Sequence, residues 1–301
     1  MLYLCGVKQL VNYISSQLSD LYGEDEALAL AWWILEELTG LNRTQLQFGD
    51  KGTKNIPNLQ IDDPKIAEII ARLLNFEPVQ YIFGHTEWLG LDLKVTPATL
   101  IPRPETAELV EEINAQMGGK KKMNVLDVGT GSGCIAVALK KAHPEWHVVG
   151  VDISAEAVEV AKENAKRNGV EVDFRQGDIF SDESGQIELF NGGEIEASGS
   201  FDIIVSNPPY IRESEKESMR RNVLDYEPAT ALFVPDSDPL CFYNRIATLF
   251  RRQPTTYFLF FEINEAFPSE LSSMLHNLGY TDIQVHNDIY GKPRIIQGRM
   301  A

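Results

Sequence analysis

A buried strand, a glycine-rich turn, a helix and a second buried strand follow one another between residues 123 and 152. The first strand, Met123-Asn-Val-Leu-Asp-Val128, continues directly into Gly129-Thr-Gly-Ser-Gly133. A glycine-rich turn between strand and helix lets a ligand approach the backbone closely and offers it the amides of the helix N-terminus. The pattern therefore predicts an α/β sheet with a binding loop made of Gly129, Thr130, Gly131, Ser132 and Gly133.

Two acidic residues stand where the next predicted strands end. Asp152 closes the strand at 147–151 and lies 19 positions after Gly133 (152 − 133). At that distance an acidic residue binds ribose hydroxyls in nucleotide-binding βαβ units. Asp178 lies in the turn Gly177-Asp-Ile-Phe180 after a third predicted strand, where its side chain could accept a hydrogen bond from an adenine amino group. We expect ligand contacts from both acids and from the residues that follow them, Ile153 and Ile179.

The apolar run Phe201-Asp-Ile-Ile-Val205 is followed at once by Ser206-Asn-Pro-Pro-Tyr210. The run predicts a buried strand, and the two prolines stiffen the loop that ends it, because proline donates no backbone hydrogen bond and favours extended geometry before it. The carboxyl edge of an open α/β sheet is where ligands bind. Asn207 and Tyr210 are therefore expected at a site, where an amide beside an aromatic ring can bind a planar group bearing NH2.

The first part of the chain differs from the rest in its periodicity. Apolar residues recur at helical spacing through residues 1–85, which predicts a small helical bundle that is either a structural extension or a substrate-docking module. Residues 86–103 read as a linker that contains a hairpin turning at Gly90. At its end, Arg103 and Thr106 either cap and solvate the start of the next helix or face the amino-acid end of a cofactor.

The glycine loop alone does not identify its ligand, because Gly131-x-Gly133-x-x-Ala136 also satisfies the dinucleotide fingerprint. Three features favour S-adenosyl-L-methionine over a nicotinamide cofactor. An acidic residue, Asp127, stands just before the first glycine, and Asp178 supplies a second acidic loop. The predicted strands around 283–285 and 294–296 form an antiparallel pair, a departure from an all-parallel dehydrogenase sheet.

Charge and cysteine content indicate which binding partners and which cellular compartment suit this chain. The net charge is −17, from 27 basic and 44 acidic residues, which repels bare nucleic acid and suits a basic protein partner. Three isolated cysteines, Cys5, Cys134 and Cys241, fit a reducing cytoplasm without a disulfide framework. Neither cysteines nor histidines show metal-ligand spacing, and no uncharged apolar stretch is long enough to span a membrane. We therefore expect no metal and no membrane contact.

Three segments together closely resemble the bacterial release factor glutamine methyltransferases, the PrmC/HemK family. They are Gly84–Thr106 with Ile101-Pro-Arg-Pro-Glu-Thr106, Val125-Leu-Asp-Val-Gly-Thr-Gly-Ser-Gly133, and Asn207-Pro-Pro-Tyr210. Tyr226-Glu-Pro228 and Pro293-Arg-Ile-Ile-Gln-Gly-Arg299 match as well. The resemblance implies a class I methyltransferase domain (α/β, Rossmann-like, seven-stranded) at 104–301, behind the linker and a helical bundle at 1–85 that docks a release factor.

The same resemblance implies an activity. The expected reaction moves a methyl group from S-adenosyl-L-methionine, leaving S-adenosyl-L-homocysteine, to the side-chain amide of Gln in the Gly-Gly-Gln motif of peptide chain release factors. The expected protein is cytoplasmic, monomeric and without direct contact to nucleic acid. Three segments depart from the family pattern: Ile179 stands where some relatives place an aromatic ring beside adenine, the insertion at 182–200 is long, and Arg251-Arg-Gln-Pro254 replaces a Pro-Gly-Gly.

The residues with predicted roles follow from these motifs. We hypothesise that the Asn207 side-chain oxygen and the Pro208 carbonyl accept the two hydrogens of the substrate amide, while Tyr210 packs against its plane. No dedicated base is obvious in the sequence. The predicted catalytic residues are Asn207, Pro208 and Tyr210; the substrate-binding residues are Asn207, Pro208, Pro209 and Tyr210; the cofactor-binding residues are Arg103, Thr106, Gly129, Thr130, Gly131, Ser132, Gly133, Asp152, Ile153, Asp178, Ile179 and Asn207.

A second activity uses the same motif. Asn-Pro-Pro-Tyr can equally bind the exocyclic amine of adenine after base flipping, which would make the chain an adenine-N6 methyltransferase on DNA or RNA. The net charge of −17 and the lack of a recognisable target-recognition domain count against that activity.

Overall fold

The protein divides into two compact units in its computed structural model, which describes residues 2–48, 59–181, 187–189, 194–195, 201–251 and 255–300. One unit comprises Met1–Phe83 together with Arg221–Tyr226, and the other comprises Gly84–Arg220 and Glu227–Ala301. Residues 252–254 and the insertion residues other than Ile187–Leu189 and Glu194–Ile195 lie outside the described residues. None of the described helices is long and apolar enough to cross a membrane.

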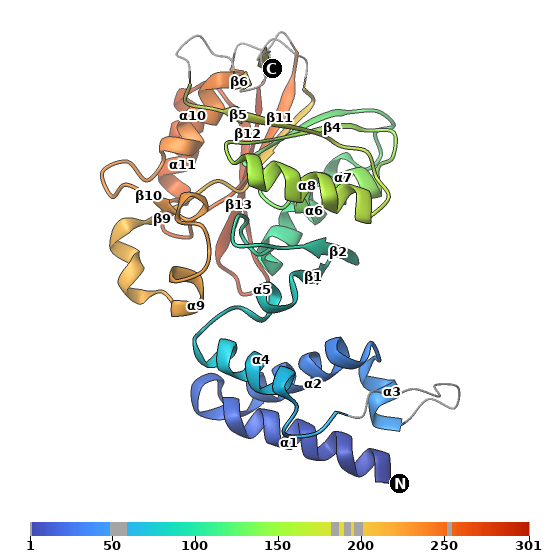
Figure 1. The fold of residues 1–301 in the computed structure, drawn as a ribbon. Helices are drawn as coiled ribbons and strands as arrows, with labels where there is room; N and C mark the ends of the chain where they lie inside the picture. Colours follow the sequence, from blue (N-terminus) through green and yellow to red (C-terminus); the bar gives the residue numbers. More distant parts are fainter. Residues whose placement is uncertain are drawn as a thin grey trace. The chain divides into compact units, whose positions relative to one another are not determined.

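The first unit is helical, as its periodicity predicts (Figure 1). Asp63 caps α4 by accepting from the Lys65 N–H, with Pro64 at the first helical position, and Gly40 ends α2 in the left-handed conformation. A short segment from later in the chain belongs to this unit, since Arg221 stacks over the Phe76 ring at 4.3 Å. The helices are α1 (Leu2–Tyr22), α2 (Glu24–Thr39), α3 (Arg43–Phe48), α4 (Pro64–Leu74), α5 (Val79–Phe83) and, from the later segment, α9 (Arg221–Leu224).

The second unit is built on a mixed sheet in the order β12-β13-β11-β8-β3-β4-β5-β6-β7. Strands β11, β8, β3, β4 and β5 are parallel to one another, and β13 is antiparallel to both β11 and β12. The strands are β3 (Asn124–Val128), β4 (His147–Asp152), β5 (Asp173–Asp178), β6 (Ile187–Leu189), β7 (Glu194–Ile195), β8 (Ile203–Ser206), β11 (Tyr257–Glu262), β12 (Thr281–Asn287) and β13 (Pro293–Met300).

The predicted seven-stranded methyltransferase sheet is confirmed by the strands from β12 to β5, including the antiparallel pair at the end of the chain. The apolar patch at 187–190 indicates a surface insertion that contains a hairpin, and the antiparallel pair of β6 and β7 confirms it. Strand β6 pairs antiparallel with β5, and β7 pairs antiparallel with β6, so the insertion extends the sheet by two short strands.

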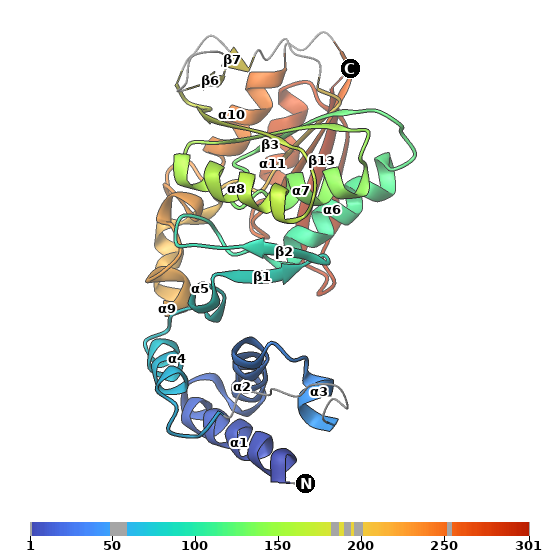
Figure 2. The same cartoon turned by 45° about the vertical axis from the view of Figure 1, so that its right-hand side comes forward.

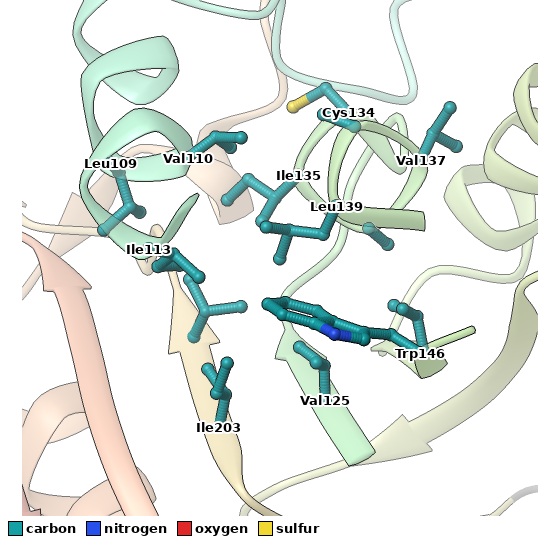
Figure 3. Packing of buried hydrophobic residues seen from close by; sticks show 14 of the residues in the cluster. Leu109, Val110, Ile113, Val125, Cys134, Ile135, Val137, Leu139, Trp146 and Ile203 are labelled. Carbon is teal, nitrogen blue, oxygen red and sulfur yellow. The ribbon is translucent and has the colours of Figure 1, made fainter. Parts of the chain in front are cut away.

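Helices cover both faces of this sheet (Figures 1 and 2). Neighbouring residues of one strand enter different clusters: Val125 packs beneath α6 and α7, whereas Leu126 packs beneath α10 and α11. This alternation explains why the parallel strands read as continuous apolar runs. Figure 3 shows the first cluster around Trp146. The helices are α6 (Pro104–Met117), α7 (Cys134–Ala142), α8 (Ala155–Arg167), α10 (Cys241–Phe250) and α11 (Pro268–Asn277).

A hairpin of β1 (His85–Trp88) and β2 (Leu91–Lys94) precedes the sheet and turns at Gly90, whose φ of 71° is the left-handed conformation that glycine adopts readily. Buried Asn164 of α8 accepts a hydrogen bond from the Lys94 N–H and donates to the carbonyls of Lys94 and Ser132. One side chain thereby ties the hairpin to the glycine loop. The remaining short elements are β9 (Ile211–Arg212), η1 (Glu213–Ser218), η2 (Ala229–Ala231) and β10 (Phe233–Val234).

Candidate active site

A cavity of about 450 Å³ opens at the carboxyl ends of β3, β4, β5 and β8. Its size falls in the range of small-molecule sites, and its position is the one where open α/β sheets bind ligands. The chain brings together there almost all residues predicted from the sequence. Those that line the cavity are Arg103, Thr106, Gly129, Thr130, Gly131, Ser132, Asp152, Ile153, Asp178, Ile179, Asn207, Pro208 and Pro209.

The glycine loop is shaped by three left-handed residues, Gly129, Gly131 and Gly133, with φ of 70°, 55° and 78°. A side chain at Gly133 would put its Cβ 2.9 Å from the Cβ of Ala161 and 3.0 Å from the Phe174 ring. Gly133 therefore does not line the cavity but allows α7 and α8 to pack closely behind the loop. Within the loop, the Gly129 and Thr130 amides donate to the Val151 carbonyl and the Gly133 amide donates to the Thr130 carbonyl.

Asp152 supports this loop as well as lining the cavity. Its Oδ2 accepts from the Gly131 N–H at 2.8 Å, and its Oδ1 accepts from the Ser154 N–H at 2.9 Å. Burial raises the pKa of Asp152, although these backbone donors partly offset the effect. Each carboxylate oxygen has a further lone pair, so Asp152 can still accept hydrogen bonds from ligand hydroxyls.

An apolar wall stands beside Asp178. The Asp178 carboxylate accepts from the Phe180 N–H at 2.8 Å, and the Phe180 ring meets the Phe242 ring edge to face at a centroid distance of 5.2 Å. Both rings line the cavity together with Ile179 and Ile153, which is 55% exposed. The aromatic surface that Ile179 cannot supply therefore comes from Phe180 and Phe242. Sequence reasoning gave neither ring a role, since Phe242 lies on a helix that reads as purely structural.

The loop after β8 presents Asn207 to the cavity. Ser206 is buried, and its hydroxyl donates to the Val128 carbonyl at 2.6 Å, which joins β8 to β3 just before the loop. The Asn207 Nδ2 donates to the Thr106 hydroxyl oxygen at 3.1 Å, and that hydroxyl donates to Glu262 Oε2 at 2.6 Å. Thr106 thus contacts Asn207 directly, a link between residues 101 positions apart.

Tyr210 has a different environment from the one expected. It does not line the cavity; its hydroxyl donates to Glu262 Oε1 at 3.0 Å, and its carbonyl accepts from Asn264 Nδ2 at 3.1 Å. Burial and the neighbouring Glu262 carboxyl raise the pKa of Tyr210 well above its usual value. Its predicted contact with the substrate amide stays a prediction.

Arg103 is held by a buried acid. Its guanidinium lies 2.5 Å from the carboxylate of Glu227, which also accepts from the Ile101 N–H at 3.1 Å. The Arg103 carbonyl accepts from the Trp88 indole N–H at 2.8 Å, so the hairpin and Glu227 together fix the segment from 101 to 103 at the cavity wall. This position fits the second of the two predicted roles, in which Arg103 faces the ligand. Glu227 had been noted only as part of a motif.

The chemistry of the lining suits a nucleoside that carries a polar tail. Asp152 offers acceptors, Arg103 offers donors, and the wall of Phe180 and Phe242 offers a surface for a planar ring. Among the described residues, no group of three or more His, Cys, Asp or Glu side chains could hold a metal ion. What the site provides is placement and hydrogen bonding around Asn207.

Comparisons with known proteins cover both units. A family model described as a methyltransferase domain matches residues 119–288, and one described as a PrmC N-terminal domain matches residues 9–84. A release factor glutamine methyltransferase of Bacteroides thetaiotaomicron is 41% identical over 96% of this chain and 99% of the relative. Another, of Flavobacterium psychrophilum, is 37% identical over 93% of this chain and 94% of the relative.

Among solved structures, the hMettl16 catalytic domain in complex with a MAT2A 3'UTR hairpin aligns with a TM-score of 0.51. The alignment covers 79% of this chain and 80% of the hMettl16 chain, at 14% sequence identity. At that identity the likeness concerns the fold alone.

Proposed function

The chain belongs to the family of release factor glutamine methyltransferases, and we infer from this that it methylates the side-chain amide nitrogen of Gln in the Gly-Gly-Gln motif of a peptide chain release factor, with S-adenosyl-L-methionine as methyl donor. The family places it among protein-glutamine methyltransferases. The observation in the structure that best supports this activity is the Asn207 amide, fixed by Thr106 at the cavity that the glycine loop borders.

We assign the cofactor to this cavity. We assign the ribose hydroxyls to Asp152, the adenine ring to the wall of Ile179, Phe180 and Phe242, and the adenine amino group to Asp178. The glycine loop and Arg103 remain for the amino-acid end, because the loop lets a ligand approach its backbone closely and a carboxylate suits a guanidinium. When bound, the sulfonium supplies an activated methyl group and a neutral thioether leaving group.

The protein's task is to present the amide nitrogen, which is a weak nucleophile because its lone pair is delocalised into the carbonyl. The Asn207 oxygen and the Pro208 carbonyl each accept one hydrogen of the substrate NH2, which aims the nitrogen at the methyl carbon and supports the positive charge that develops on it. A nitrogen–carbon bond forms as the carbon–sulfur bond breaks, and the extra proton leaves to solvent. Orientation of this kind can lower a barrier by roughly 7–11 kcal/mol.

Recognition of a release factor also needs contacts beyond one side chain. We assign such contacts to the helical unit matched by the PrmC N-terminal domain, because binding energy from remote parts of a substrate can be used to orient its reacting group. Since release factors act in translation, the protein is expected in the cytoplasm.

Mass spectrometry of release factors incubated with the protein and isotope-labelled S-adenosyl-L-methionine tests the activity. The expected product carries one labelled methyl on the Gln of Gly-Gly-Gln, and a factor with Glu in place of that Gln stays unmodified because a carboxylate offers neither NH2 donors nor a nitrogen nucleophile. Oligonucleotides in the same reaction stay unlabelled. Label on adenine and none on Gln would make the chain an adenine methyltransferase instead.

A further inference from the structure

Glu262 is a buried carboxylate at the last position of β11, with 1% of its surface exposed, and it does not line the cavity. Taking a carboxylate out of water is costly unless its oxygens receive good hydrogen bonds. Both oxygens do: Oε2 accepts from the Thr106 hydroxyl at 2.6 Å and Oε1 from the Tyr210 hydroxyl at 3.0 Å. The two donors thus connect Glu262 to the active-site loop from both sides.

Burial raises the pKa of Glu262, whereas hydrogen bonds from the Thr106 and Tyr210 hydroxyls and the charge of Arg294 favour its ionised form. In that form the carboxylate can only accept hydrogen bonds, and this fixes the direction of every bond that follows. Thr106 has one hydroxyl proton, which it gives to Glu262, so its oxygen can only accept from Asn207. The Asn207 side chain must therefore turn its NH2 group to Thr106 and its oxygen the other way. Without this constraint, an amide can rotate by a half-turn and present donors where the substrate also presents donors.

The second oxygen of Glu262 acts on the other end of the same loop. Tyr210 lies three residues after Asn207, and its hydroxyl and its carbonyl are held by Glu262 and Asn264. Two stiff prolines separate the two held residues. One carboxylate therefore holds the start of the loop through Thr106 and the end of the loop directly.

We propose that Glu262 is a positioning residue for methyl transfer: through Thr106 it sets the Asn207 amide with its oxygen towards the substrate nitrogen, and through Tyr210 it holds the loop in register. This role rests on the proposed function, because it assumes that the group bound by Asn207 carries NH2 hydrogens. Glu262 itself does not touch the substrate.

The substitution Glu262→Gln tests whether the direction of these hydrogen bonds matters, because it changes the hydrogen-bonding groups of the side chain but hardly its shape. A Gln side chain can accept from one hydroxyl only and offers an NH2 group to the other. If that NH2 meets Thr106, the threonine proton turns to Asn207 and the amide flips; if it meets Tyr210, the far end of the loop loses its anchor. We expect kcat for methylation of a release factor to fall at least tenfold, with the dissociation constant for S-adenosyl-L-methionine unchanged within twofold by calorimetry.

A double-mutant cycle with Asn207→Ala separates positioning from a general structural role. Both arms of the proposal act by placing the Asn207 amide, so Glu262→Gln should change kcat by less than threefold once Asn207 is already Ala. Thr106→Val, which keeps the shape and removes the hydroxyl, is expected to lower kcat like Glu262→Gln, and Thr106→Ser to recover most of that loss. The matched control Glu265→Gln removes an exposed carboxylate three positions along the chain, paired with Lys292, and should leave kcat unchanged.

Each outcome decides the proposal. The proposal is overturned if Glu262→Gln lowers kcat as much in the Asn207→Ala protein as in the wild type. It is also overturned if Glu262→Gln alone has the wild-type kcat. If Glu262→Gln fails to fold, as judged by circular dichroism and thermal melting, Thr106→Val and Thr106→Ser carry the same cycle. Failure of the function itself looks different, because the wild-type protein would then transfer no methyl group to Gln at all.

Discussion

Replacing Asp152 by Ala should weaken S-adenosyl-L-methionine binding without unfolding the protein. The change removes a carboxylate hydrogen bond to ribose, a loss of about 2 kcal/mol of binding energy. It also removes the acceptor of the Gly131 N–H, which loosens the loop in the free protein. A loss of about 2 kcal/mol corresponds to a roughly 30-fold higher dissociation constant. Stability should change little, because burial raises the pKa of Asp152 and the folded protein thus holds its charge at a disadvantage.

Isothermal titration calorimetry measures this affinity directly, and thermal melting without ligand checks the fold. Asp152→Asn is expected to fall between wild type and Asp152→Ala, because an amide keeps one acceptor oxygen for two backbone donors. Asp173→Asn is the control: this acid lies at the amino end of β5, away from the site, and pairs with Arg175. An Asp152→Ala protein that binds as tightly as wild type would refute both the ribose role and the support of the loop.

Three further outcomes follow from the same structure. Asn207→Ala should lower kcat for Gln methylation at least a hundredfold, about 2.7 kcal/mol of transition-state stabilisation, as measured from initial rates. A protein shortened to Gly84–Ala301 that still melts cooperatively should methylate a full-length release factor no better than a short Gly-Gly-Gln peptide, whereas equal efficiency with the whole protein would make the helical unit structural only. Burial raises the pKa of Asp127 from 3.8 to about 7, so the folded state keeps a proton that the unfolded chain loses, and this contribution to the free energy of unfolding declines as pH rises from about 4 to about 7. Denaturant titrations at several pH values should show that decline in wild type and its absence in Asp127→Asn.

Much of the fold was predictable because local pattern and tertiary burial agree. Strands such as β3 and β8 are buried on both faces, so they appear in the sequence as short, mainly apolar runs without alternation that lead into a glycine-rich or proline-rich loop. The hairpin turn at Gly90 and the cap at Asp63 depend on one or two neighbouring residues, and sequence shows such features well. The hairpin of β6 and β7 was indicated by the apolar patch at 187–190, but its addition to the sheet edge was not predictable, because strands this short do not specify which strand they pair with.

The cavity was predictable wherever a functional residue directly follows a strand. Gly129, Asp152, Asp178 and Asn207 each stand at or just after the carboxyl end of a parallel strand, so sheet topology alone brings them together. The residues that sequence reasoning missed act at long range. Glu227 meets Arg103 across 124 positions, and Phe242 reaches the cavity from a helix whose periodicity describes only its buried side.

Glu262 shows why such residues escape a reading of the sequence. It ends the buried strand Tyr257–Glu262, where an acid reads as the point at which the chain returns to solvent. Helix α6 begins at Pro104 and brings Thr106 close to this strand end. Glu262 is therefore a buried hydrogen-bond acceptor whose donor, Thr106, lies 156 positions earlier in the sequence. The motif Asn-Pro-Pro-Tyr therefore does not by itself determine how its residues are oriented in the active site. Its prolines fix the backbone, but the orientation of the Asn207 amide depends on the direction of hydrogen bonds set by Glu262, a residue outside the motif. The spacing of apolar residues in the sequence gives no information about the direction of such hydrogen bonds.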